Sequence, residues 1–138
     1  MKRYSLFDHT ADLGIEFFGE SREKLFISAG TGLFDVIAGI DSINPDRDFH
    51  IRIEGMDMED LLVNWLRELL YLNQVKKMLI SEFSIQELSD TFLDGIVRGE
   101  PFKPEKHDIK KEVKAVTYHG LEVGEDGGIW KARVIFDV

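Results

Sequence analysis

The densest group of chemically capable side chains in this sequence lies near its N-terminus. Asp8, His9, Thr10 and Asp12 place two carboxylates, an imidazole and a hydroxyl within five residues, just before a run with strand-like alternation. Carboxylates are the side chains that hard cations such as Ca²⁺ prefer as ligands. The alternative is an ordinary solvated turn. Because two acids are too few for a complete metal cage, a metal site here needs ligands from a second segment.

The C-terminus is the candidate for that second segment. Asp137 and Val138 directly follow a strongly alternating run. Asp137 offers a carboxylate, and Val138 offers a backbone carbonyl and an α-carboxylate. Ca²⁺ takes about six to eight oxygen ligands, backbone carbonyls and water included. The residue types therefore allow a cation site at Asp12, Asp137 and Val138, whereas the alternative is an acidic chain end that is simply solvated.

The hydrophobic pattern predicts which strands must bring these ends together. Alternation of period two is typical of half-buried strands. We expect strands near residues 13–17, 49–53, 79–88, 92–97, 113–123 and 130–137. Asp12 begins the first of these strands and Asp137 ends the last. The two residues can meet most simply if those strands are neighbours in a sheet.

Apolar residues spaced three and four apart predict two helices. The first spans residues 22–38, with Ser21 as its N-cap and Gly39 as its stop, and the second spans residues 58–76 after an N-cap at Asp57. Helices and strands in this order predict an α+β fold. We expect a two-layer sandwich, in which both helices pack on one face of a largely antiparallel mixed sheet, and a single domain over residues 1–138.

The composition excludes several classes of function. The net charge of −9 disfavours tight binding to bare nucleic acid or to an anionic membrane, and it suits a cation binder or a partner of a basic surface. The chain has no cysteine, which excludes disulfides, thiolate zinc sites and cysteine nucleophiles. We see no signal peptide and no apolar run long enough to span a membrane, so we expect a cytoplasmic location.

Other polar groups have ordinary explanations. The lysines of residues 103–114 alternate with acids, which is typical of an exposed segment with many ion pairs rather than an RNA site. His107 and His119 could act as acids or bases, or could simply form hydrogen bonds. The glycines of residues 124–128 lack the Lys-Ser/Thr pair and the following helix of a phosphate-binding loop.

Four segments together resemble the archease family. Residues 8–14 (DHTADLG) resemble the family's opening motif, and residues 65–71 (WLRELLY) resemble its central helix. His107 followed by residues 112–121 (EVKAVTYHGL), and the terminal Asp137-Val138 pair, are similar to the family's C-terminal half. The segments occur in family order and cover nearly the whole chain.

The resemblance implies an accessory protein of an RNA ligase. That ligase joins tRNA exon halves, sealing a 3′-phosphate or 2′,3′-cyclic phosphate end to a 5′-hydroxyl with GTP and a divalent metal. Archeases are expected to speed guanylylation of the ligase's active-site histidine, to support multiple turnover and to broaden nucleotide use. The resemblance also implies a bound metal, typically Ca²⁺, at Asp12, Asp137 and Val138, and no catalytic residues.

Two other classes of function stay open. A stand-alone metal-dependent enzyme, such as a phosphohydrolase, would use the same carboxylates, but no nucleophile, base and phosphate clamp occur together in the sequence. A general chaperone or small protein-binding module would need none of them. Assays on phosphoesters would distinguish the enzyme, and a pull-down would distinguish the binding module.

Overall fold

The computed structural model describes residues 3–9 and 12–138; the side chains of residues 8 and 9 fall outside the description. Strands and helices alternate along the described chain, and no helix in it is long and apolar enough to cross a membrane. The elements are β1 (Tyr4–His9), β2 (Asp12–Gly19), α1 (Arg22–Ala38), a short 3-10 helix (Ile40–Ser42), β3 (Arg47–Glu54), α2 (Met58–Gln74), β4 (Met78–Leu88), β5 (Phe92–Pro101), β6 (Ala115–Asp126) and β7 (Ile129–Asp137).

Both predicted helices are confirmed, together with their N-caps. The Ser21 hydroxyl accepts a hydrogen bond from the Lys24 amide at 3.1 Å, and the Asp57 carboxylate accepts one from the Asp60 amide at 2.8 Å. These bonds satisfy amides that have no partner inside the first turn of a helix. Gly39 ends α1 with φ +75°, a backbone conformation that favours glycine. The second helix, α2, ends two residues before the predicted 76.

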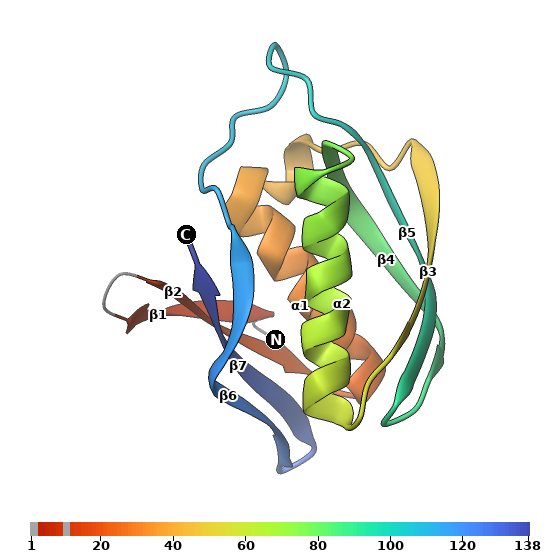
Figure 1. The fold of residues 1–138 in the computed structure, drawn as a ribbon, viewed down its shortest axis with the longest axis vertical. Helices are drawn as coiled ribbons and strands as arrows, with labels where there is room; N and C mark the ends of the chain where they lie inside the picture. The colour runs from red at the N-terminus through yellow and green to blue at the C-terminus, as the bar shows by residue number, and fades with distance from the viewer. Residues whose placement is uncertain (1–2, 10–11) are drawn as a thin grey trace.

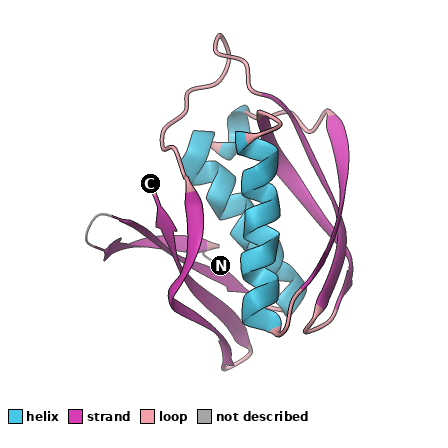
Figure 2. Cartoon of the chain, viewed as in Figure 1, coloured by secondary structure: helices cyan, strands magenta, loops and turns pink. Residues whose placement is uncertain are grey.

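The strands form two antiparallel sheets, so the α+β class and the antiparallel pairing are confirmed, but the single mixed sheet is not. One sheet has four strands in the order β1-β2-β7-β6, and the other has three in the order β3-β5-β4. In Figure 1 the four-stranded sheet lies to the left of the helices and the three-stranded sheet to the right. Figure 2 shows the same division by secondary structure, with the two helices between the strands.

Two glycines on α1 lie where the two sheets contact this helix. A Cβ added at Gly30 would lie 2.5 Å from the Phe83 ring of β4, and one added at Gly32 would lie 2.9 Å from the Phe17 ring of β2. The two sheets therefore approach α1 where it has no side chain. A helix buried on several sides needs apolar cover from more than one direction, and the second sheet supplies it.

Trp65 of α2 connects the helices and the three-stranded sheet. Its side chain is fully buried, and its indole nitrogen donates to the Phe26 carbonyl at 2.9 Å. Its ring packs against Phe26 and Phe83 with centroid separations of 6.5 and 6.2 Å. Burying a large apolar side chain stabilises a fold by about 1.5–3 kcal/mol. This contact therefore holds α1, α2 and β4 at fixed positions, as expected for a core tryptophan.

Candidate cation site

The strands that carry Asp12 and Asp137 are neighbours, as predicted. The pairing of β2 with β7 is antiparallel, and Leu13 faces Phe136. Leu13–Phe136 is the last pair of this ladder, and the next positions along the two strands are Asp12, at the start of β2, and Asp137, at the end of β7. The β2–β7 pairing thus brings opposite ends of the chain to one edge of the four-stranded sheet.

This geometry suits a cation. Residues directly opposite each other on antiparallel strands point to the same side, with Cβ atoms roughly 4.5–5.5 Å apart, and like charges in such a pair repel. Asp12 is half-buried and Asp137 is exposed, so solvent would only partly screen charges at this end of the sheet. A divalent cation between the two carboxylates would replace that repulsion with attraction.

Val138 follows Asp137 at the same edge. It is half-buried and packs against the hydrophobic core, which fixes the main chain that carries its carbonyl. Across the described side chains, no group of three or more His, Asp or Glu is arranged to hold a metal ion. Asp12 and Asp137 supply only two carboxylates, so backbone oxygens and water would complete the coordination shell. The side chains of Asp8 and His9, and all of Thr10, lie outside the described residues.

A third strand also reaches this edge. Ala115 of β6 pairs with Asp137, and the Lys114 amide donates to the Asp137 carbonyl at 2.8 Å. The Lys114 carbonyl in turn accepts from the Gln74 side chain of α2 at 2.8 Å. These bonds position the main chain of Asp137 from two directions. Sequence reasoning did not assign Gln74 or Lys114 to the site; the nearest signal was that Lys114 lies at the start of the strand predicted over residues 113–123.

The loop before Lys114 is anchored by a buried ion cluster around Glu100. This side chain has no exposed surface, and it accepts hydrogen bonds from the Asn44 amide at 2.7 Å and from the Lys106 ammonium at 2.6 Å. Lys103 lies 3.3 Å from its other oxygen. Burial alone would raise the pKa of Glu100, but the hydrogen bonds outweigh it and lower the pKa to about 2. Glu100 therefore stays ionised and holds the loop.

His107 belongs to the same cluster and has a structural role. Its side chain is fully buried, and its Nδ1 accepts from the Lys103 amide at 2.9 Å. The proton therefore resides on Nε2, which donates to Glu100 at 3.1 Å. This supports the hydrogen-bonding alternative for His107. His119 is exposed on β6.

Residues 4–138 match the model of the archease protein family. The chain belongs to this family. Its relatives confirm the assignment over the full length. Protein archease of Methanopyrus kandleri is 36% identical over 134 residues, which cover 95% of this chain and 96% of the relative. Protein archease of Pyrococcus furiosus is 37% identical and both chains are covered over 100% of their length.

Solved structures confirm the archease fold. The solution structure of Methanobacterium thermoautotrophicum protein 1598 matches with a TM-score of 0.84 and 35% identity, covering 100% of both chains. The crystal structure of an archease from Thermotoga maritima, described as a possible chaperone, matches with a TM-score of 0.67 and 25% identity. That match covers 96% of this chain and 94% of the Thermotoga chain.

Proposed function

We propose that this archease-family protein activates the tRNA-splicing RNA ligase in the cytoplasm, promoting guanylylation of the ligase and its multiple turnover. Asp12, Asp137 and Val138 would hold a divalent cation, with Ca²⁺ the best match to oxygen ligands. The observation that carries the proposal is the pairing of β2 with β7 in a family member, because the register that ends at Leu13 and Phe136 leads next to Asp12 and Asp137. Bound there, a divalent cation would neutralise charge that develops on phosphate oxygens during nucleotidyl transfer.

The protein's own residues would present this edge in one orientation. The pairing of β2 with β7 would align the two carboxylates, and the Lys114 amide donates to the Asp137 carbonyl. The net charge of −9 would favour approach to a basic, anion-binding active site. In this proposal the protein acts as an accessory factor, and the ligase performs the covalent steps.

The test is ligation of RNA ends by the host ligase under limiting GTP, with and without this protein. We expect the wild-type protein to raise the multiple-turnover rate, and Asp12→Asn and Asp137→Asn each to reduce that stimulation by at least about tenfold, because each removes one charged ligand from a hard-cation site. Asp126→Asn is the matched control, since Asp126 is an exposed acid at the opposite end of β6. Stimulation at the wild-type level by both site variants, with circular dichroism unchanged, would exclude the carboxylates from the working site.

A general chaperone is the second candidate, because the related Thermotoga archease is described as a possible chaperone. This function predicts that the protein suppresses aggregation of unrelated, heat-denatured proteins. The Asp12→Asn variant separates the two functions: it should keep chaperone activity and lose ligase activation. Suppression of aggregation without any effect on the ligase would favour the chaperone.

A further inference from the structure

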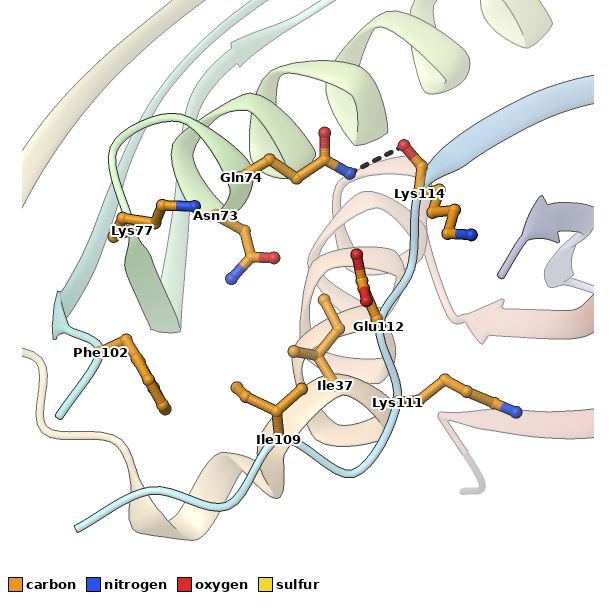
Figure 3. Close-up of a pocket in the computed structure, with 9 residues that line it drawn as sticks. All are labelled: Ile37, Asn73, Gln74, Lys77, Phe102, Ile109, Lys111, Glu112 and Lys114. Carbon is orange, nitrogen blue, oxygen red and sulfur yellow. Dashed lines mark hydrogen bonds between the residues drawn. The ribbon is translucent and has the colours of Figure 1, made fainter. Parts of the chain in front are cut away.

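A cavity of about 530 Å³ lies between the C-terminal ends of α1 and α2 and the loop that joins β5 to β6 (Figure 3). Sites for small ligands commonly enclose roughly 300–1,000 Å³. None of the predicted cation ligands lines this cavity. Its walls are formed by Ile37, Asn73, Gln74, Lys77, Phe102, Ile109, Lys111, Glu112 and Lys114.

The base of the cavity is apolar. Ile37 of α1 is almost fully buried, Phe102 is half-buried, and Ile109 of the loop remains 45% exposed. The three side chains come from different segments and surround the same space in Figure 3. Leaving such apolar surface in water costs about 25 cal/mol per Å². The base would therefore be stabilised by an aliphatic or planar group that covers it.

The polar atoms that face this space are mostly hydrogen-bond acceptors. The Asn73 amide nitrogen donates to the Met78 carbonyl at 3.1 Å, which leaves its oxygen available. In Figure 3 that oxygen and the Glu112 carboxylate both point into the cavity. The Glu112 carboxylate makes no hydrogen bond or ion pair with another described residue. An occupant should therefore supply donors and positive charge.

The lysines that line the cavity do not change its excess of hydrogen-bond acceptors and negative charge. In Figure 3 the ammonium groups of Lys111 and Lys114 point away from the cavity, and only that of Lys77 points inward. Lys77 is exposed and adopts a left-handed backbone conformation with φ 58° just after α2. Lys77 therefore supplies one flexible cation to a cavity that also holds the Glu112 carboxylate and the Asn73 amide oxygen.

We propose that this cavity binds a basic side chain, specifically arginine, of a partner protein. The guanidinium would donate to Glu112 and to the Asn73 oxygen, because it presents five N–H groups in one plane. Its aliphatic stem would cover Ile37 and Ile109, and the Phe102 ring offers a face for the cation. The net charge of −9 favours the approach of a basic partner.

The cavity borders the candidate cation edge without sharing its ligands. The Gln74 side chain donates to the carbonyls of Val113 and Lys114, and the Lys114 amide donates to Asp137. A partner that inserts an arginine here would thus dock beside Asp137. The inference does not depend on the ligase proposal, since the binding can be measured on the isolated protein.

The test is a nuclear magnetic resonance titration of the full chain with N-acetyl-arginine N-methylamide, following the signals of Ile37 and Ile109. We expect saturable shifts of these signals. The affinity for the arginine analogue should fall about fivefold in Glu112→Gln, a modest loss because the ion pair between the guanidinium and Glu112 would be exposed to solvent. Glu105→Gln is the matched control, because it removes the same charge from an exposed position of the loop outside the cavity. Lys77→Asn should tighten binding about twofold, because asparagine tolerates the left-handed conformation and the opposing charge is gone.

Chemical controls decide the class of ligand. The citrulline analogue keeps the shape of arginine without its charge, and it should bind at least about fivefold more weakly. The proposal is overturned if arginine produces no saturable shifts, if citrulline binds equally well, or if Glu112→Gln leaves the affinity unchanged. Tighter binding of the capped glutamate analogue would also overturn it, by identifying an anion site.

Discussion

At the scale of single residues, the register of β2 and β7 leads to two carboxylates, Asp12 and Asp137, at one end of the four-stranded sheet. Their strands are hydrogen-bonded neighbours, so the two groups cannot move far apart without breaking the ladder. Repulsion in the absence of a cation and attraction in its presence should both appear in the stability of the fold. The proposed cation site can therefore be tested on the isolated protein, without a ligase.

We expect Ca²⁺ to raise the melting temperature of the wild-type protein by about 9 °C when its concentration is a hundredfold above the dissociation constant, because a ligand stabilises the state that binds it. Differential scanning calorimetry with chelator and then with Ca²⁺ measures the change. Asp137→Asn should melt higher than the wild type in chelator and respond little to Ca²⁺. An equal Ca²⁺ response in Asp137→Asn and in the Asp126→Asn control would contradict the proposed ligand set.

The buried Glu100 predicts a pH dependence of stability. Its pKa is lowered from 4.5 to about 2 in the folded protein. A carboxyl group with a lowered pKa contributes stability above its unfolded pKa, and this contribution is lost as the pH falls through that range toward 2. Urea unfolding between pH 6 and pH 2.5 should therefore show a decreasing free energy of unfolding.

Glu100→Gln should lose about 1–3 kcal/mol at pH 6, because it removes charge-assisted hydrogen bonds from buried donors. Its free energy of unfolding should also fall less steeply at acid pH than that of the wild type. Glu105→Gln, an exposed neighbour in the loop, serves as the control. Parallel pH curves for Glu100→Gln and the wild type would show that Glu100 is not the titrating group.

At the scale of elements, α1 is a helix shaped to touch two sheets. Gly30 and Gly32 reduce its intrinsic helix propensity, and in isolation they look like a weakness. In the folded chain they admit the Phe83 and Phe17 rings to the helix surface. The loss of propensity is thus offset by close packing on both sides.

Gly30→Ala tests this balance. Alanine favours the helix by about 1 kcal/mol, but its Cβ would lie 2.5 Å from the Phe83 ring. Overpacking of this kind costs about 1–3 kcal/mol, so we expect net destabilisation in urea unfolding. Adding Phe83→Leu should recover part of the loss in a double-mutant cycle. A stabilised Gly30→Ala protein would mean that the ring moves aside at little cost.

At the scale of the whole molecule, the net charge of −9 should govern how the protein meets its partner. Charges at an interface speed association and are screened by salt. If the ligase is the partner, its affinity for this protein should fall by about tenfold or more between 0.05 M and 0.5 M salt. Titrating salt in a binding assay measures this. An affinity that does not change with salt would remove electrostatics from the interaction.

Much of the local structure could be read directly from the residues. Ser21 and Asp57 cap the helices as predicted, because a cap depends on residues three positions away. Strands β2 and β7 were also expected to be neighbours, since a cation site shared by Asp12 and Asp137 requires the strands that carry them to be adjacent. β1 was not predicted, because Tyr4–His9 lacks strict alternation of apolar and polar residues. The extension of β5 to Pro101 was missed as well, because proline usually ends a strand.

Helix positions and their caps followed from local pattern, because they depend on residues within about one helical turn. The acidic character of the chain followed from its composition alone. The division into two sheets and the cavity near Glu112 depended on tertiary packing. Helix α1 needs cover from both sides, and Glu100 holds the loop so that Glu112 faces Asn73 of α2. Such contacts join segments far apart in the chain, and their free energy arises only when the whole core has assembled.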